Sequence, residues 1–471
     1  MPLINEVKIL KNIRVAVESK AEKFVVKFNQ SISQAFKKID ENQVRSVIVV
    51  DDENHVIGIA TDGDIRRFLI NNPDMNASIE LCANKEFKFA RAKDSREKIL
   101  KLLDYTIQVI PIIDSKNRLI DIISRHEFPL KEEKSQVARS KSPVRISFGG
   151  GGTDLTHYFV KHGGAVLNAT VQIYSHASLR KRSDLEVHIY SGDIKKSIVS
   201  DTVGQLPESG PFKLINAAIR LIDPQYGFDL NVYSDFPMKS GLGGSAVVLS
   251  SIIGCFNEFR EDKWDSYEMA ELAFQAERIT LDMAGGWQDQ YATVFGGFNF
   301  MEFTNENNII HPLRIPNRTR LELEENLLLC YTNSSHNSGD IHKEQKKSFE
   351  GNSDIQKLVH QNFDLTYKMK NLILKNRLDE FGKTLGDVWD LKRQFSNSIS
   401  NTELDDIYNS AMESGALGGK LLGAGGGGFF LFYVRPFERS KVIESLTGKN
   451  CTIANILFDD KGLQTWKVRI N

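Results

Sequence analysis

The stretch Ser240-Gly-Leu-Gly-Gly-Ser-Ala246 lies next to an apolar strand pattern and leads into residues 245–259, whose apolar side chains recur at helical spacing. Its glycines let backbone N–H groups approach an anion closely, and the N-terminus of the following helix would favour a phosphate. Taken alone, the same turn is also an ordinary tight connection between a strand and a helix. The stretch therefore predicts a strand, a glycine loop and a helix, and its surroundings decide whether a phosphate binds there.

Two further glycine clusters flank this stretch: Arg145-Ile-Ser-Phe-Gly-Gly-Gly-Gly-Thr-Asp154 and Gly423-Ala-Gly-Gly-Gly-Gly428. A dinucleotide-binding fingerprint fails in the first cluster, because Asp154 stands where its last glycine belongs. A Walker P-loop fails as well, because the only Gly-Lys-Thr, at 382–384, has Arg377 in place of the leading glycine. The three clusters together favour a different phosphate-binding fold.

The whole chain has 471 residues, which corresponds to about three domains at roughly 150 residues each. Its net charge of −1 offers no bulk attraction for nucleic acid or an anionic membrane. No apolar run approaches the roughly 20 residues of a membrane span, and the first ten residues lack the core of a signal peptide. The four cysteines show no CxxC spacing, which predicts neither a disulfide framework nor a zinc site. We expect a cytoplasmic protein without a nucleic-acid or membrane partner.

Residues 5–130 contain an internal repeat, which a shift of 63 positions reveals. Val49-Val50-Asp51 falls on Ile112-Ile113-Asp114, and Thr61 and Asp64 fall on Ser124 and Glu127. Each half is predicted as a helix, at 33–40 or 96–103, followed by a buried strand, a polar turn and a second strand. Such halves usually pack as a pair.

The two halves resemble a pair of CBS domains, and Thr61-Asp62-Gly63-Asp64-Ile65-Arg66-Arg67 is similar to the stretch that holds the ribose of an adenine nucleotide in that family. A hydroxyl and a carboxylate three residues apart suit vicinal ribose hydroxyls, although Thr61 and Asp64 would equally cap a helix that begins near Ile65. The resemblance implies an adenine nucleotide at Thr61 and Asp64 and a homo-oligomer formed through the pair. The second half departs from the pattern at Ser124 and Glu127.

The domain boundaries follow from changes in composition. Residues 127–141 are polar and lack apolar periodicity, so the linker is expected at 135–141, after a CBS pair over 1–134 with repeats at about 5–70 and 71–130. From Ser142 onward, apolar strands alternate with glycine-rich turns. We expect an α/β (α+β) protein whose remaining domains cover 142–310 and 311–471.

Residues 142–471 resemble the GHMP kinase superfamily. Pro237-Met-Lys-Ser-Gly-Leu-Gly-Gly-Ser-Ala246 is similar to its phosphate-binding loop, with Gly244 where many members have serine, and Gly415–Gly428 is similar to its third motif. The resemblance implies a ribosomal-S5-like N-terminal half and a ferredoxin-like C-terminal half. Within the superfamily, Ser142–Leu155 and Gly286–Gly297 are most similar to the D-glycero-D-manno-heptose 7-phosphate kinases, with Trp287 departing from a lysine often found there.

This resemblance implies an ATP-dependent kinase that phosphorylates the anomeric hydroxyl of a heptose 7-phosphate, for the synthesis of nucleotide-activated heptose. Asp289 would take the proton of that hydroxyl, and Arg145 would stabilise the charge of the transferring phosphoryl group. Mg²⁺ would be held by Ser245 and Glu277, which lies twelve residues before Asp289. The implied ATP-binding residues are Ser240, Gly241, Leu242, Gly243, Gly244, Ser245 and Ala246. The implied substrate-binding residues are Gly151, Gly152, Thr153, Asp154, Gly425 and Gly426.

Each of these side chains also has an ordinary interpretation: Asp289 and Asp154 as helix caps, Glu277 as a helix-surface residue and Arg145 as an exposed strand residue. Two other functions stay open, a kinase for a free sugar such as fucose or galactose and a nucleotide-binding regulatory protein that does not catalyse. The densest basic clusters, Arg180-Lys181-Arg182 and Lys392-Arg393, are candidates for a second phosphate, although most charge runs are solvated faces. The sequence leaves open the sugar, its anomer and the effect of the CBS ligand.

Overall fold

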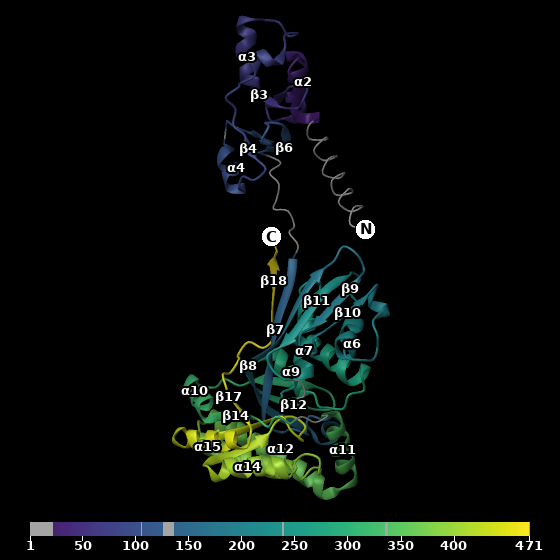
Figure 1. Cartoon of the computed structure of the whole chain (residues 1–471), viewed down its shortest axis with the longest axis vertical. Coiled ribbons are helices and arrows are strands. Elements are labelled where there is room, and N and C mark those ends of the chain that lie inside the picture. Colours follow the sequence, from purple (N-terminus) through teal and green to yellow (C-terminus); the bar gives the residue numbers. More distant parts are fainter. Residues whose placement is uncertain (1–21, 105, 126–135, 238–239, 335–337, 471) are drawn as a thin grey trace. The chain divides into compact units, whose positions relative to one another are not determined.

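The computed structural model describes residues 22–104, 106–125, 136–237, 240–334 and 338–470. The chain divides into two compact units, Met1–Glu133 and Lys134–Asn471 (Figure 1). This division falls next to the predicted end of the CBS pair at residue 134. Each unit has its own hydrophobic clusters.

Each half of the smaller unit is built on a three-stranded sheet with the same strand arrangement. The first half contains β1 (Val25–Lys27), α2 (Ile32–Asn42), β2 (Ser46–Val50), β3 (Val56–Thr61) and α3 (Asp62–Asn71). After a 3₁₀ helix at Ile79–Cys82, the second half contains β4 (Ala90–Arg91), α4 (Arg96–Leu102), β5 (Val109–Ile113) and β6 (Leu119–Ser124). In both sheets the first pair of strands is parallel and the second is antiparallel.

The internal repeat is visible in the turns that join these strands. Asn54 and Asn117, 63 positions apart, have φ angles of 70° and 64°, because asparagine tolerates the left-handed conformation that each turn requires. The two turns also bond to each other, since Val56 N donates to Asn117 O and Leu119 N donates to Asn54 O, both at 3.0 Å. Apolar side chains of β2 and β5 share one cluster. The predicted packing of the halves as a pair is confirmed.

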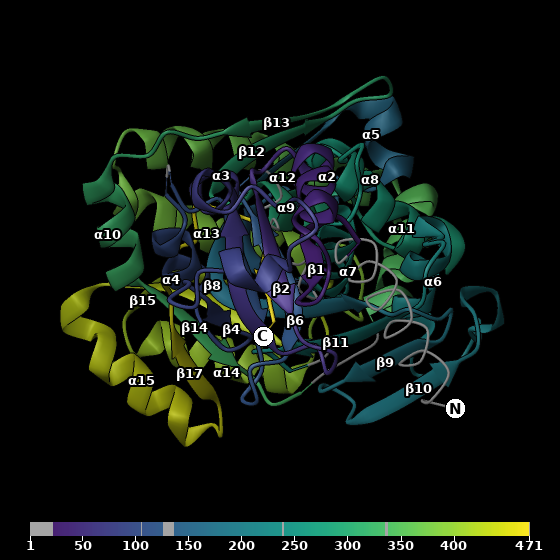
Figure 2. The same ribbon diagram turned by 90° about the horizontal axis from the view of Figure 1, so that it is seen from above.

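The larger unit contains an eight-stranded sheet covered by helices, and Figure 2 shows its strands β9, β10 and β11 side by side. The strands are β7 (Gln136–Gly149), β8 (Gly164–Lys181), β9 (Val187–Ser191), β10 (Lys196–Ser200), β11 (Phe228–Ser234), β12 (Phe298–Phe303), β13 (Asn308–Pro312) and β18 (Gln464–Arg469). The helices are α5 (Thr156–His162), α6 (Lys213–Ile222), α7 (Gly244–Asn257), α8 (Ser266–Phe274) and α9 (Gln288–Phe295), with a π-helix at Gln275–Thr280 and a 3₁₀ helix at Val203–Gln205. α7 contacts the sheet and also α6, α8 and α9, so it is buried around most of its circumference rather than along one apolar stripe.

A second, antiparallel sheet of four strands in the order β15-β16-β14-β17 follows. Its strands are β14 (Leu327–Tyr331), β15 (Ala416–Leu421), β16 (Phe429–Val434) and β17 (Thr452–Asn455). The helices of this part are α10 (Asn317–Asn326), α11 (Ser338–Gly351), α12 (Ser353–Leu374), α13 (Leu378–Lys392), α14 (Thr402–Glu413) and α15 (Arg439–Gly448), with a 3₁₀ helix at Pro436–Glu438. Phe148 of β7 packs edge to face on Phe381 of α13 with ring centroids 5.3 Å apart, so side chains of both parts form one core.

The strand directions exclude a doubly wound parallel sheet. In the described part of the larger unit, β9 and β11 are the only parallel pair, and all other neighbouring strands run antiparallel. A nucleotide crevice of the Rossmann kind needs parallel strands. The predicted α/β architecture without such a crevice is confirmed.

Two predicted boundaries differ from the structure. Residues 136–141, expected in the linker, form the start of β7, because pairing with β8 on one side and β18 on the other satisfies the backbone of this polar stretch. The end of the chain, assigned to a domain over 311–471, returns to the first sheet as β18.

The described helices include none that is both long enough and apolar enough to cross a bilayer.

Candidate active site

The loop before α7 has the backbone conformation that its glycines predict. Gly241 and Gly243 have φ angles of 78° and 77°, a region that disfavours side chains. α7 begins at Gly244, so the N–H groups of its first turn have no carbonyl partner within the helix. A Cβ on Gly244 would lie 2.8 Å from Cε2 of Phe236, which accounts for a glycine where a serine was expected.

The third glycine cluster packs directly on this loop. A Cβ on Gly423 would lie 2.8 Å from the Cα of Gly241, and a Cβ on Gly428 would lie 2.4 Å from the carbonyl oxygen of Ser240. The backbone N–H of Phe429 also donates to the Ser240 carbonyl at 3.2 Å. Only glycine lets the two backbones come this close, and the structure therefore brings the second and third clusters together.

Gly425 and Gly426 lie next to Ile399 in the third cluster. Gly426 N donates to the carbonyl oxygen of Ile399 at 2.8 Å, and a Cβ on Gly425 would lie 2.8 Å from the Cα of Ile399. Backbone packing thus explains these two glycines. Their contact with a substrate stays a prediction.

Asp289 and Arg145 form an ion pair beside the glycine loop. Nε of Arg145, in β7, donates to Oδ1 of Asp289, in the first turn of α9, at 2.7 Å, and its Nη1 donates to the Gly241 carbonyl at 2.8 Å. A Cβ on Gly243 would lie 3.2 Å from Oδ2 of Asp289, so the carboxylate faces the loop closely. Arg145 is only 3% exposed. It is therefore no surface arginine, and it holds the carboxylate at the start of α7.

Asp154 is a buried carboxylate at the end of the first glycine cluster. Its Oδ1 accepts from Gly152 N at 3.1 Å and its Oδ2 from Gln288 N at 3.3 Å. A Cβ on Gly286 would lie 1.8 Å from Oδ2, so that glycine makes room for the carboxylate. Burial raises the pKa of Asp154, and the charge of Asp289 raises it further. The two carboxylates thus lie close enough to repel each other.

Thr153 fixes the shape of the first glycine cluster. Its hydroxyl oxygen lies 2.8 Å from the carbonyl oxygens of both Gly150 and Ala165, which share its one proton, and it accepts from Ala165 N. The Thr153 side chain is fully buried, whereas the Gly151 carbonyl accepts from Nδ2 of Asn362 at 3.1 Å. The loop is tied to β8 and to α12, and direct contacts of Gly151, Gly152 and Thr153 with a substrate stay predictions.

Glu277 lies in the π-helix and is 4% exposed. Its Oε2 accepts from Nε2 of Gln290 at 2.8 Å, and the hydroxyl of Ser245 lies near enough to influence its pKa. Burial raises the pKa of Glu277 despite the nearby Arg278, Gln290 and Ser245. The predicted pair of Ser245 and Glu277 is thus brought together and offers oxygen ligands, which suit Mg²⁺. No cluster of three or more His, Cys, Asp or Glu side chains in the described residues could hold a metal ion by itself.

Two buried lysines lie at the site. Lys392, at the end of α13, donates to the carbonyl oxygen of Gly423, and Lys420, in β15, donates to the Ser147 carbonyl at 2.7 Å. Burial lowers the pKa of Lys392 to about 8; the charge of Arg145 lowers it too, while those of Asp154 and Asp289 raise it. Burial lowers the pKa of Lys420 as well, with Lys392 and Arg145 contributing. Sequence reasoning missed Lys420, although a lysine within an apolar strand is a signal that could have found it.

His342, in α11, is another residue that sequence reasoning missed. Its Nδ1 is buried and has no hydrogen-bond partner in the described chain. Burial lowers the pKa of His342 to about 4, and the charges of Arg278 and Lys392 contribute, so the ring is neutral at pH 7. Three other buried polar atoms without partners lie in the glycine loop and in α9. They are the Ser240 hydroxyl and Oε1 of Gln288 and Gln290. Such atoms are expected where a polar ligand binds.

Trp287, which departs from the expected lysine, is held by packing. Its ring stacks on Phe274 with centroids 3.5 Å apart, and its Nε1 donates to the Thr156 hydroxyl at 3.0 Å. Its backbone N–H donates to the Asp154 carbonyl at 3.2 Å. Trp287 therefore supports the loop that carries Asp154.

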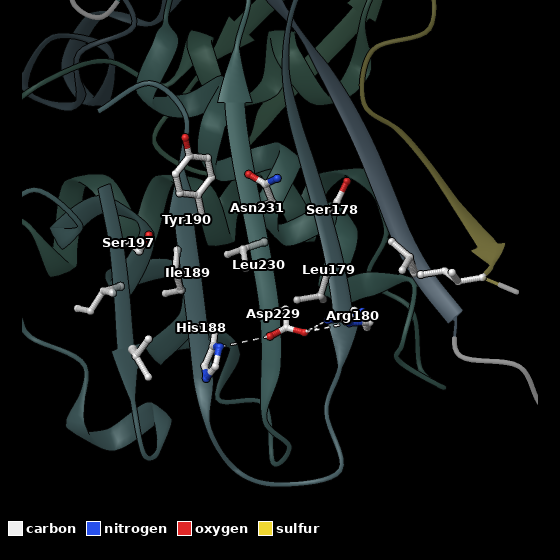
Figure 3. A pocket seen from close by; sticks show the side chains of 14 residues that line it. Ser178, Leu179, Arg180, His188, Ile189, Tyr190, Ser197, Asp229, Leu230 and Asn231 are labelled. Carbon is white, nitrogen blue, oxygen red and sulfur yellow. Dashed lines mark hydrogen bonds and ion pairs between the residues drawn. The ribbon is translucent and has the colours of Figure 1, made fainter. Parts of the chain in front are cut away.

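In the basic cluster Arg180-Lys181-Arg182, the two arginines pair with neighbouring carboxylates, and Lys181 lies over the rings of Tyr226 and Phe259. Arg180 donates to Asp229 at 2.6 Å, and Arg182 pairs with Asp184, Glu186 and Asp229. Figure 3 shows Arg180 and His188 both directed at Asp229, in a pocket on the strands β8, β9, β10 and β11. None of the residues implied for catalysis, ATP, Mg²⁺ or the sugar lines this pocket.

Thr61 and Asp64, the predicted ribose pair, cap α3. Thr61 Oγ1 accepts from Asp64 N at 3.1 Å, while Oδ2 of Asp64 accepts from the N–H and the hydroxyl of Thr61 at 3.0 and 2.6 Å. The other oxygen of Asp64 pairs with Arg67. In the second half Ser124 is buried, and Glu127 lies outside the described residues. Nucleotide binding at this pair stays a prediction.

The side chains and N–H groups around the start of α7 in the larger unit can bind phosphate and a cation and can accept a proton. Unpaired N–H groups at the start of α7 can hold a phosphate chain, and the buried pair Ser245 and Glu277 can hold an oxygen-ligated cation. Asp289 can accept a proton from a hydroxyl while Arg145 and Lys392 offset negative charge. This combination suits phosphoryl transfer to an alcohol.

Comparisons with known proteins agree with this geometry. Residues 213–297 match the GHMP kinases N terminal domain, residues 369–451 match the GHMP kinases C terminal domain, and residues 19–71 match the CBS domain.

Individual relatives extend the match over the larger unit. The D-glycero-alpha-D-manno-heptose 7-phosphate kinase of Campylobacter jejuni is 35% identical over 336 residues, which cover 70% of this chain and 99% of that protein. The crystal structure of a D-glycero-D-manno-heptose 1-phosphate kinase from Bacteroides thetaiotaomicron is 29% identical, with a TM-score of 0.60 over 70% of this chain and 99% of the other. The L-fucokinase/L-fucose-1-P guanylyltransferase of Bacteroides fragilis is 26% identical over 78% of this chain and 43% of its own length.

Proposed function

The chain belongs to the GHMP kinase family, and from this premise we propose that it transfers a phosphoryl group from ATP to the anomeric hydroxyl of D-glycero-D-manno-heptose 7-phosphate. The product would be the 1,7-bisphosphate. Support comes from the Campylobacter jejuni relative, whose name states this substrate and which is matched over 99% of its length. The fucokinase relative supports a kinase for free sugars as the second candidate, at lower identity.

The position of Asp289 carries the proposal. Its carboxylate lies against the start of α7 and accepts from Nε of Arg145 at 2.7 Å. A sugar hydroxyl beside Oδ2 would give its proton to Asp289 while its oxygen faces the glycine loop. Arg145 and Lys392 would then stabilise the charge that develops on the transferring group.

The residues present fit ATP and Mg²⁺. The buried, unpartnered hydroxyl of Ser240 and the N–H groups of the α7 first turn would bind the phosphates of ATP, and Ser245 with Glu277 would hold the cation. When bound, ATP supplies the phosphoryl group and Mg²⁺ neutralises its oxygens. Two backbone N–H groups hold the Asp154 carboxylate in place, and it would orient the sugar hydroxyls.

A substrate panel tests the proposal. ATP consumption is measured with D-glycero-D-manno-heptose 7-phosphate, the same heptose without phosphate, L-fucose and D-galactose. We expect the highest kcat/KM with the heptose 7-phosphate. A preference for fucose or galactose would establish the second candidate instead, and no turnover with any sugar would indicate a nucleotide-binding regulatory protein.

For the smaller unit we propose an adenine-nucleotide sensor that uses Thr61 and Asp64. The CBS match over residues 19–71 includes both side chains. A ligand there alters catalysis only if it distinguishes two states of the chain. Sedimentation with and without AMP would test the homo-oligomer that we expect to form through this unit.

A further inference from the structure

A cleft of about 650 Å³ lies between α5 and α11 of the larger unit, both labelled in Figure 2. Thr156, His157, Lys161 and His162 line it from α5, and Phe349 and Glu350 line it from α11. Asp154 and Thr156 are two residues apart, so the cleft begins within about 7 Å of the Asp154 backbone. The cleft thus adjoins the predicted sugar site on the side of Asp154.

The basic side chains of this cleft are unpaired. Among the described residues, Lys161, His157 and His162 make no side-chain hydrogen bond and no ion pair. The basic cluster at 180–182 differs, because Arg180 and Arg182 are bound to carboxylates there. Three unpaired nitrogen-bearing side chains on one short helix form a binding surface for an anion.

Aromatic packing holds the imidazoles of α5 in place. The ring of Phe349 lies 5.6 Å from that of His157 and 6.2 Å from that of His162, and it packs edge to face on Tyr158 at 5.3 Å. Glu350 is the acidic residue at this wall, and its Oε1 lies 4.0 Å from Nζ of Lys346. Lys346 therefore offsets part of the negative charge on the α11 side.

The order of contacts gives the direction in which a sugar would extend. Asp289 lies at the glycine loop, and the neighbouring Gln288 donates its N–H to Asp154. Trp287 donates its backbone N–H to the backbone carbonyl of Asp154 and its Nε1 to the hydroxyl of Thr156, so it joins the Asp154 backbone to the rim of the cleft. A sugar with its reacting hydroxyl at Asp289 and other hydroxyls at Asp154 would direct its far end toward α5.

We propose that the cleft between α5 and α11 binds the phosphate monoester at the far end of the sugar substrate, with Lys161 as its charged ligand and His157 and His162 as further donors. This inference rests on the proposed function. Lys392 is a less suitable ligand for that phosphate, because its buried ammonium binds the Gly423 carbonyl next to the glycine loop.

Kinetics with matched substrates test the proposal. In Lys161→Met, kcat/KM for the heptose 7-phosphate should fall about 10- to 100-fold, the effect of losing a hydrogen bond to a charged group. The value for the heptose without phosphate should not change, and Lys161→Arg should restore most of the loss. Arg180→Met, which removes a cation from the pocket of Figure 3, should change neither value. An equal fall with both substrates, or no fall, would overturn the cleft assignment.

A second measurement separates this inference from the proposed function. The ring signals of His157 and His162 are followed by NMR while inorganic phosphate is added to the full-length wild type and to Lys161→Met. Shifts in the wild type that are lost in the variant support the cleft whatever the sugar is, and unchanged wild-type signals overturn it. Failure of the wild type to phosphorylate the heptose 7-phosphate would refute the proposed function alone.

Discussion

Two regions of the molecule place a hydroxyl and a carboxylate near the start of a helix, and the two carboxylates differ in what they bind. At the start of α3, Thr61 and Asp64 bond to each other and to the helix backbone. At the start of α7, Ser245 lies near Glu277 instead, a carboxyl group distant in sequence that is 4% exposed and accepts a hydrogen bond from Gln290. The first arrangement stabilises a helix without any ligand, whereas the second buries charge that the helix does not need.

Burial of charge is therefore the more informative signal. A cap contributes about 1 kcal/mol to its helix, and it accounts for the hydrogen bonds that Thr61 and Asp64 make with each other without any ligand. Burying Asp154, Glu277 and Lys392 opposes folding, because each group loses hydration. Chains retain such groups mainly where chemistry or binding requires them. The predictions below test whether this contrast between the two regions holds.

The largest effect is expected from Asp289→Asn. The amide keeps the shape of the carboxylate and can still accept from Arg145, but it cannot take a proton. We expect kcat to fall by roughly 10² to 10⁴, with ATP binding retained and the fold intact. Steady-state kinetics and thermal unfolding check this, with Asp235→Asn at the exposed pair with His176 as the control. Near-normal turnover would reduce Asp289 to a residue that orients the substrate.

Changes at Lys392 should follow. Lys392→Met removes a positive charge from the site and should lower kcat by about 10²-fold. Because the pKa of Lys392 is lowered to about 8, the wild-type ammonium loses its proton near that pH, and kcat/KM should decline above it. Lys392→Arg keeps the charge at all these pH values and should move the decline to higher pH. A decline that stays in place in the arginine variant would belong to another group.

The sequence alone predicts several elements of both regions. The glycine clusters, the helix after Ser240-Gly-Leu-Gly-Gly-Ser-Ala246 and the repeat at 63 positions depend on local spacing, which the sequence displays directly. The start of β7 was misjudged, since its polar residues are held by β8 and by β18 from the other end of the chain. Pairing between segments that are more than 300 residues apart leaves no local pattern.

Sequence motifs predict the site residues that lie within them, and they do not predict the others. Arg145, Asp154, Glu277 and Asp289 stand in recognisable stretches. His342 and Lys420 reach the site through the packing of α11 and β15, and single residues there carry no motif. Whether a carboxylate ends in a cap or in a buried cluster depends on tertiary burial, which spacing alone does not reveal.

A smaller effect, of opposite sign for stability and activity, is expected from Glu277→Gln. Burial raises the pKa of Glu277, so the folded chain binds this proton more tightly than the unfolded chain. The stability of the wild type should therefore decrease as the pH rises through the range in which Glu277 ionises. The variant should lack this decrease and gain about 0.5–2 kcal/mol at neutral pH, the range of single stabilising substitutions, while activity falls.

Unfolding measured from pH 4 to pH 8 in both chains checks this prediction. Glu258→Gln is the control, because the pKa of Glu258 is lowered and its loss should destabilise the chain near neutral pH. A Glu277→Gln chain that is less stable than wild type would show that the carboxylate is satisfied in the fold without a cation.

The smallest effect is expected from Asp64→Ala, and it decides whether the first region is only a cap. Loss of the capping box should cost about 1 kcal/mol in the smaller unit and leave basal turnover unchanged. If Asp64 also binds ribose, calorimetry of the full chain should find two ATP sites in the wild type and one in Asp64→Ala. Asp62→Ala serves as the matched control, since Asp62 lies in the same turn and, among the described residues, its side chain pairs only with Arg66, at 2.5 Å. Equal stoichiometry in all three chains would show that Thr61 and Asp64 only cap α3, where their oxygens already have partners. The two regions would then differ fully, because only Glu277 would serve a ligand.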